Sequence, residues 1–241
     1  MSEFTPRHLV FIRHGESEGD VRRRAISAGL DYPLQKHPKD ELQTEKGHLQ
    51  SKAAGECVLN NIIKQYNIGD FDEYRVSPLR RTVLSAYSTG LSENWINDDL
   101  LCERDRGVIQ GLTKSQHQDR FPKSYDQMIN QPFHWTPPKG ESILRVAHRI
   151  GNLISTLDTT KNYLFMTHRD VMWACQMPIE HKSLDEMESI NTDEIDNGYI
   201  MHYTNVNPTS GRANTTSICW KRTINPNLPN QQSDWMPVAN P

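Results

Sequence analysis

The residues with the clearest chemical potential lie near the amino end, in the segment Arg13-His14-Gly15-Glu16-Ser17. A guanidinium beside an imidazole, followed by a glycine that lets the backbone approach a ligand closely, is typical of a phosphate pocket. A neutral imidazole can attack phosphorus with one ring nitrogen, and a pKa near ~6.5 leaves it largely uncharged at neutral pH. This pattern makes His14 a candidate nucleophile and Arg13 a candidate phosphate ligand.

Three later residues suit the same reaction. Arg81 lies in Ser-Pro-Leu-Arg-Arg-Thr at 77–82, just after a predicted strand, and Glu103 lies in Leu-Cys-Glu-Arg-Asp-Arg-Gly at 101–107. His168 follows another predicted strand. In open α/β sheets, ligands bind beyond the carboxyl ends of the strands, so we expect these side chains to lie close together there.

These motifs, with Gly-Glu-Ser at 140–142, resemble the histidine phosphatase superfamily, which has the phosphoglycerate mutase-like fold. The resemblance extends over residues 8–205 and favours the phosphatase branch of the family. It implies a catalytic set with His14 as the phosphorylated nucleophile, Arg13 and Arg81 as phosphate ligands, Glu103 as proton donor and His168 as the second histidine.

The implied set is chemically coherent. Arg13 and Arg81 can each donate paired hydrogen bonds to phosphoryl oxygens, and a protonated His168 would add a third cation. A nearby phosphate raises the pKa of Glu103 by repulsion, which keeps this carboxyl protonated for the departing alkoxide. The same carboxylate could then activate water against the phosphohistidine. Asp105 is the competing candidate for the acid.

Candidate substrate contacts surround these residues. Ser17 is expected to donate its hydroxyl to the phosphate. Asp20 stands where relatives commonly have asparagine, and it would repel a phosphate unless it is protonated or paired with a basic residue at 22–24. Arg169 stands where glycine is usual and adds positive charge. The remaining candidate contacts are Arg106 and Lys114.

Alternating strand-like and helix-like segments predict an α/β fold with a mainly parallel central sheet flanked by helices. The predicted strands are residues 8–13, 73–77, 162–167, 199–203 and 215–220, and the predicted helices are 43–66, 79–91, 141–157 and 170–177. Residues 25–41 and 130–140 are predicted loops because glycine and proline interrupt them.

Length and composition limit the alternatives. The 241 residues predict one catalytic domain over residues 1–224 and a proline- and asparagine-rich tail over 225–241 that is poorly ordered. With 27 basic and 30 acidic residues the formal net charge is −3, which argues against nucleic-acid and membrane partners. The four cysteines are scattered and no apolar run reaches ~18 residues, so we expect a cytoplasmic protein without metal or other cofactor.

Function stays open between three classes. A phosphomonoesterase acting on a small phosphorylated metabolite is preferred over a phosphoglycerate or phosphosugar mutase, because Arg120 is the only arginine between Gly111 and Lys139. The mutases of the family carry paired arginines there. A phospho-ligand binding module without turnover is the third class, and a homodimer is one candidate assembly. A serine hydrolase using Ser17 in Gly-x-Ser-x-Gly is disfavoured, since only one short strand precedes it.

Overall fold

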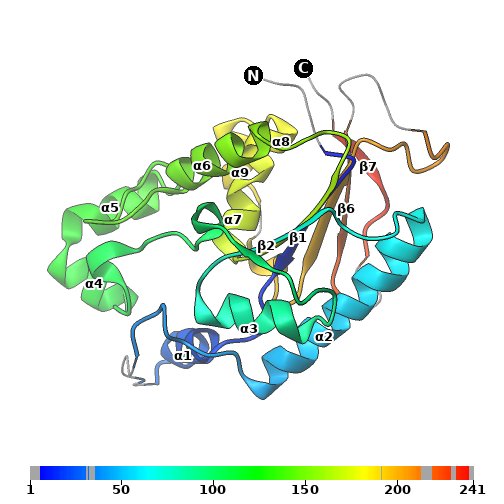
Figure 1. Ribbon diagram of the computed structural model, residues 1–241. Coiled ribbons are helices and arrows are strands. Elements are labelled where there is room, and N and C mark those ends of the chain that lie inside the picture. Colours follow the sequence, from blue (N-terminus) through cyan, green and yellow to red (C-terminus); the bar gives the residue numbers. More distant parts are fainter. Residues whose placement is uncertain are drawn as a thin grey trace.

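The computed structural model describes residues 6–30, 32, 36–190, 192–212, 219–228 and 232–238. Within these ranges seven strands form one sheet in the order β3-β2-β4-β1-β5-β6-β7 (Figure 1). The strands are β1 His8–Arg13, β2 Glu73–Val76, β3 Ile96–Asn97, β4 Asn162–Thr167, β5 Ile200–Thr204, β6 Cys219–Ile224 and β7 Met236–Val238. The first four strands of this order run parallel, and β5, β6 and β7 add antiparallel pairings. The predicted mainly parallel core of an α/β fold is confirmed.

Helices cover both faces of the sheet. The α-helices are α1 Glu18–Ser27, α2 Glu45–Val58, α3 Arg80–Ser88, α4 Lys114–Arg120, α5 Pro122–Asn130, α6 Ile143–Ser155, α7 Arg169–Ala174, α8 Gln176–Glu180 and α9 Leu184–Glu188. Figure 1 shows α2 and α3 on one face and α6 to α9 on the other. None of these described helices has the length and apolar character needed to cross a membrane.

Strand β1 shows how the sequence builds the two layers. Alternate side chains of a strand point to opposite faces of its sheet. Leu9 and Phe11 accordingly pack in the core beneath α6 and α7, whereas Val10 and Ile12 pack in the core beneath α2 and α3. All four side chains are fully buried. A strand that is apolar on both faces is typical of the centre of a parallel sheet. Because β1 is held firmly in this core, Arg13 and His14 at its carboxyl end have a fixed position.

Several predicted boundaries differ from the structure. The predicted helix 43–66 is α2 followed by a π-helical stretch, Leu59–Lys64. The predicted loop 25–41 is wrong at its start because α1 extends to Ser27. Helix α1 is strongly polar, so it lacks the apolar periodicity that would have indicated it, and its capping box at Ser17 defines its start. The predicted strand 215–220 overlaps β6 only at Cys219 and Trp220, since β6 continues to Ile224 and residues 215–218 lie outside the described ranges.

The C-terminal segment takes part in the sheet, which differs from the prediction of a poorly ordered tail. Strand β7 pairs with β6, so that Val238 lies opposite Cys219. Just before β7, the half-buried ring of Trp235 stacks on the guanidinium of Arg222, whose Cζ lies 4.7 Å from the ring centre. This aromatic and cationic contact anchors a segment whose polar composition alone indicated disorder.

Candidate active site

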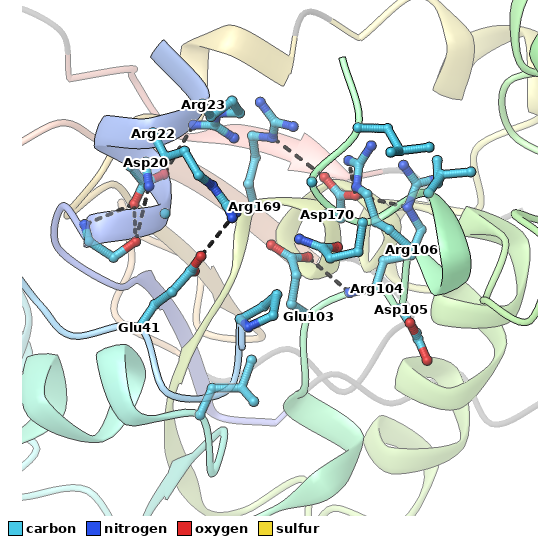
Figure 2. Close-up of a pocket in the computed structure, with 18 of the residues that line it drawn as sticks. Asp20, Arg22, Arg23, Glu41, Glu103, Arg104, Asp105, Arg106, Arg169 and Asp170 are labelled. Carbon is cyan, nitrogen blue, oxygen red and sulfur yellow. Dashed lines mark hydrogen bonds and ion pairs between the residues drawn. The ribbon is translucent and has the colours of Figure 1, made fainter. Parts of the chain in front are cut away.

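The candidate catalytic residues meet beyond the carboxyl ends of the parallel strands. Strand β1 ends at Arg13 and leads directly to His14, and β4 ends at Thr167 and leads to His168. Strand β2 leads to α3, whose first turn carries Arg81. A cavity of about 790 Å³ opens at this edge of the sheet and contains the side chains drawn in Figure 2. This is the position at which open α/β sheets bind ligands.

His14 is held in one tautomer. Its Nδ1 lies 2.7 Å from the carbonyl oxygen of Gly15, and because a carbonyl oxygen can only accept, Nδ1 carries the proton. Burial lowers the pKa of His14 to about 3, although the charge of Asp20 opposes this shift. The imidazole is therefore neutral, with a lone pair on Nε2 available for attack.

Arg81 lies between the two histidines. Its Nε is 3.4 Å from His14 Nε2, and its terminal Nη2 is 3.4 Å from His168 Nδ1. The two imidazole rings are 5.0 Å apart between their centres. The other terminal nitrogen of Arg81 donates to the carbonyl oxygen of Pro38 at 2.7 Å. One guanidinium thus faces both imidazoles, where it can contact a group bound to His14.

His168 is predicted to act as a third cation, and its position in the structure disfavours the proton that this role requires. Its side chain is fully buried, and it does not line the cavity. Burial, reinforced by the charge of Arg81, lowers its pKa well below the ordinary value. Its Nε2 lies 2.8 Å from the hydroxyl oxygen of Ser77 and 3.2 Å from that of Thr82. These contacts hold a neutral imidazole in place behind the reacting centre.

Glu103 is suited to carry a proton. Burial raises its pKa, and the negative charge of nearby Asp170 raises it further. Its Oε2 lies 4.0 Å from His168 Nδ1, and its Oε1 accepts the backbone N–H of Arg104 at 3.0 Å. The competing acid, Asp105, is exposed and accepts a backbone N–H of its own loop. In Figure 2 its carboxylate points away from Glu103, so the geometry favours Glu103 as the acid.

Asp20 is paired with basic residues inside the cavity. Its carboxylate accepts Arg13 at 2.8 Å and Arg23 at 3.0 Å, so the expected partner at 22–24 is Arg23. Burial would raise the pKa of Asp20, but these neighbouring charges hold it below its ordinary value. The hydroxyl of Ser17 donates to Asp20 at 2.7 Å within the α1 capping box. Ser17 therefore differs from its predicted role, because its proton is directed at a carboxylate.

A second acidic centre, Asp170, organises three arginines at the cavity wall. Arg104 and Arg106 approach the same oxygen, Oδ2, at 2.9 and 3.0 Å, and Arg169 approaches Oδ1 at 3.4 Å. Burial would raise the pKa of Asp170, but the three guanidinium charges hold it well below its ordinary value. Lys114, at the start of α4, is exposed and also lines the cavity.

The cavity brings together nearly all of the predicted site residues. Those that line it are Arg13, His14, Ser17, Asp20, Arg81, Glu103, Arg106, Lys114 and Arg169, while His168 lies behind them. Sequence reasoning missed the roles of Glu41, Arg104, Asp170 and Asn197. Glu41 pairs with Arg22 at 3.0 Å, and Asn197 donates to the carbonyl oxygen of His14 at 3.1 Å. The sequence marked Arg104 and Asp170 only as members of short charged runs that follow Glu103 and His168.

Within the described ranges, no three His, Cys, Asp or Glu side chains are grouped so that they could hold a metal ion. The charges that act on His14 are the guanidinium groups of Arg13 and Arg81 and the carboxylate of Asp20.

Comparisons with known proteins agree with this architecture. Bovine 6-phosphofructo-2-kinase/fructose-2,6-bisphosphatase 1 is 28% identical over 184 residues, which are 76% of this chain and 35% of that protein. The chain thus spans about a third of the length of the curated relatives it matches. A mycobacterial glucosyl-3-phosphoglycerate phosphatase solved with VO₃ has a TM-score of 0.63 at 21% identity, covering 82% of this chain and 92% of that one. An Entamoeba histolytica phosphoserine phosphatase has a TM-score of 0.62 at 17% identity, covering 82% and 90%.

At these identities, similarity to solved structures shows only the fold. The family is shown by a match to a family model over most of the chain. The family model described as histidine phosphatase superfamily (branch 1) matches residues 9–215. This range includes every candidate catalytic residue of the cavity. The chain belongs to the histidine phosphatase superfamily (branch 1).

Proposed function

We propose that the chain is a metal-independent phosphomonoesterase that transfers the phosphoryl group of a small phosphorylated metabolite to His14 and then to water. The observation that carries this proposal is the orientation of His14. Its Nδ1 proton is bound by the carbonyl oxygen of Gly15, and its Nε2 is directed at Arg81 inside a cavity. A fixed neutral nucleophile beside a cation is what phosphoryl transfer to histidine requires.

In the first step, the lone pair on His14 Nε2 forms a bond to phosphorus. The bond between phosphorus and the ester oxygen breaks, and the departing oxygen takes a proton from Glu103. The raised pKa of Glu103 supports this role because a general acid must hold its proton near neutral pH. The products of this step are the dephosphorylated alcohol, a phosphohistidine and the Glu103 carboxylate.

In the second step, the Glu103 carboxylate takes a proton from a water molecule, and the water oxygen attacks phosphorus. The bond between phosphorus and Nε2 breaks, and its electron pair returns to the imidazole. Inorganic phosphate leaves, and both His14 and Glu103 regain their starting states. Arg81, at 3.4 Å from both imidazoles, and Arg13 supply the positive charge that the phosphoryl oxygens need in both transition states.

Two further observations support hydrolysis over mutase activity. Arg120, the one arginine between Gly111 and Lys139, does not line the cavity. The names of the relatives described above include the word phosphatase or bisphosphatase, and that of the bovine relative also includes a kinase. Water is therefore the proposed acceptor of the phosphoryl group.

The test is hydrolysis of p-nitrophenyl phosphate by the wild type and by His14→Ala, with and without EDTA. We expect His14→Ala to lower kcat by about 10⁴-fold or more, since removal of a nucleophile abolishes the covalent route. EDTA should change nothing. Rapid acid-free quenching with radiolabelled substrate should trap a phosphoenzyme in the wild type. His148→Ala, at an exposed histidine of α6, is the matched control and should keep full activity.

Three results would contradict the proposal. Unchanged hydrolysis by His14→Ala would show that His14 is not the nucleophile. Phosphate binding without turnover of any phosphomonoester would indicate a binding module. Faster formation of 2-phosphoglycerate from 3-phosphoglycerate than release of inorganic phosphate would indicate a mutase.

A further inference from the structure

Asp20 places a carboxylate beside the nitrogen of His14 that does not attack phosphorus. Its Oδ2 lies 3.9 Å from His14 Nδ1, and both side chains are buried. The Nδ1 proton is already bound by the carbonyl oxygen of Gly15, at 2.7 Å. The distance to Asp20 is too long for a hydrogen bond, so this carboxylate acts on the imidazole through its charge.

The contacts of Asp20 keep that charge in place. Its Oδ1 accepts Nη2 of Arg13 at 2.8 Å and Nη2 of Arg23 at 3.0 Å. Its Oδ2 accepts the backbone N–H and the hydroxyl of Ser17, at 3.0 and 2.7 Å, and the side-chain amide of Asn197 at 3.3 Å. Burial acts to raise the pKa of Asp20, but donors to both oxygens stabilise the ionised form and hold this pKa below its ordinary value. The group is therefore a carboxylate throughout the reaction.

A helix cap alone does not account for this arrangement. The capping box of α1 needs only an oxygen that accepts from Ser17, which Oδ2 of Asp20 supplies. Its Oδ1 and the two guanidinium partners lie outside that motif. Burial is the largest cause that lowers the pKa of His14. Among the charges that act on this pKa, that of Asp20 is the largest and raises it, whereas those of Arg81 and Arg13 lower it.

The proposed reaction changes the charge of the imidazole twice. When His14 Nε2 bonds to phosphorus and Nδ1 keeps its proton, the ring becomes an imidazolium with one positive charge. When water displaces the imidazole, the bond between phosphorus and Nε2 breaks, its electron pair returns to the ring, and the ring is neutral again. A fixed carboxylate 3.9 Å from Nδ1 stabilises the positive ring, so it favours the first step and slows the second.

We propose that Asp20 is a positioning residue for the nucleophile. Its charge acts through His14 to stabilise the phosphorylated imidazolium, and it thereby sets the balance between phosphorylation and hydrolysis of the enzyme. This inference rests on the proposed function and adds a residue to its machinery.

The test measures the two steps separately in a single turnover. Enzyme in saturating excess over p-nitrophenyl phosphate, radiolabelled in its phosphoryl group, is quenched in alkali at a series of times, and the phosphoenzyme gives a rate constant for its formation and one for its decay. Asp20→Asn removes the charge and keeps the shape of the side chain. Formation should slow and decay should become faster, so the ratio of formation to decay should fall by about tenfold or more. Damage to the fold would instead slow both steps.

Two controls separate the charge from the structure. Ser17→Ala removes the hydroxyl that donates to Oδ2 but keeps the carboxylate, so the ratio should stay at the wild-type value. Asp119→Asn changes an exposed carboxylate of α4 that does not line the cavity, and it should leave both rate constants unchanged.

Arg23→Gln tests the same charge in the opposite direction. The side chain of Arg23 is 46% exposed, so its replacement leaves the core intact. It removes one of the two cations paired with Asp20, which strengthens the negative field at His14. The ratio of formation to decay should therefore rise above the wild-type value. If Asp20→Asn fails to fold by circular dichroism, this variant decides.

Failure of this role is distinguishable from failure of the proposed function. A ratio that Asp20→Asn leaves unchanged or raises, or that Arg23→Gln leaves unchanged or lowers, would overturn the role of Asp20 while hydrolysis through His14 stands. No phosphoenzyme in the wild type and full activity of His14→Ala would together overturn the proposed function itself.

Discussion

Glu103 and Asp170 are two carboxyl groups of one cavity whose pKa values are displaced in opposite directions. Burial and the charge of Asp170 raise the pKa of Glu103. Burial acts on Asp170 as well, but Arg104, Arg106 and Arg169 outweigh it and lower the pKa of that group. When the pKa values of two neighbouring carboxyl groups differ, one can act as a proton donor while the other stays a carboxylate. Asp170 then orients arginines while Glu103 exchanges protons.

Replacing Glu103 should therefore remove the proton donor and leave the nucleophile intact. We expect Glu103→Gln to lower kcat by about 10²- to 10⁴-fold for an alkyl phosphate such as glycerol 3-phosphate. In kcat/KM, which reports phosphoryl transfer to His14 and not the later attack of water, the loss for p-nitrophenyl phosphate should be smaller, because nitrophenolate leaves without needing a proton. A general acid works only when protonated, so wild-type kcat for the alkyl ester should fall as the pH rises through the pKa of Glu103. The variant should lack this alkaline decline.

Two controls accompany that measurement. Glu93→Gln changes an exposed carboxylate of the same chemistry and should leave kcat unchanged. Asp105→Asn tests the competing acid. A larger loss for Asp105→Asn than for Glu103→Gln, restricted to the alkyl ester, would reassign the proton donor to Asp105.

At the scale of elements, the close contact between α2 and α3 determines where Arg81 lies. Gly55 of α2 faces the carbonyl oxygen of Thr89, just beyond α3, and a Cβ atom at Gly55 would lie 2.0 Å from that oxygen. No real side chain tolerates such a distance from backbone. A glycine is therefore required for the two helices to approach, and α3 carries Arg81 in its first turn.

Gly55→Ala should push α3 away from α2. We expect the free energy of unfolding to fall by about 1–3 kcal/mol, the usual effect of overpacking a well-packed contact. Because Arg81 moves with α3, KM for phosphomonoesters should also rise. Urea unfolding and steady-state kinetics measure the two effects. Glu56→Ala, at the exposed neighbouring position, is the control and should change neither value; equal stability of Gly55→Ala and wild type would refute the contact.

Across the described residues, five buried histidines have lowered pKa values, and one of them, His117, lines the cavity. Two of them, His14 and His168, belong to the site. Two more, His8 and His202, lie at the opposite end of β1, where His8 Nδ1 is 3.0 Å from His202 Nε2. Burial is the largest cause in every case, and for His8 it lowers the pKa to about 4. The folded protein therefore excludes protons that the unfolded chain accepts.

The stability of the fold should consequently decrease in mild acid. Well above pH 6.5 these histidines are neutral in both the folded and the unfolded chain, so the free energy of unfolding does not depend on their protonation. As the pH falls below 6.5 the unfolded chain binds protons and the folded protein does not, until the folded pKa is reached, about 4 for His8. Between pH 7 and pH 5 we expect the free energy of unfolding to fall by about 2 kcal/mol for each such histidine.

Urea unfolding at a series of pH values checks this expectation. His8→Asn should have a smaller pH dependence than the wild type, because one proton-binding difference is lost. His148→Asn, at an exposed histidine, should keep the full dependence. Equal stability of the wild type at pH 7 and pH 5 would show that the buried imidazoles accept protons within the fold.

The sequence by itself determined the central strands and the main chemical groups. The short apolar runs within 8–13 and 162–167 predict buried strands, and the structure has both at the predicted bounds. The order of strands then places His14, Arg81 and His168 at one edge of the sheet, because parallel strands share the edge at which they end. These features depend on local residue type and on chain order, both of which a sequence displays.

Only the tertiary structure decided which charges meet and which protons are held. Asp20 pairs with Arg13 across the turn from β1 to α1, and Asp170 contacts Arg104 and Arg106, which lie more than 60 residues earlier in the chain. Polar α1 and the strand β7 likewise form through capping and pairing that no apolar pattern marks. The physical reason is that the energy of a charged group depends on its burial and on its neighbours in space. The residue type alone specifies neither of these.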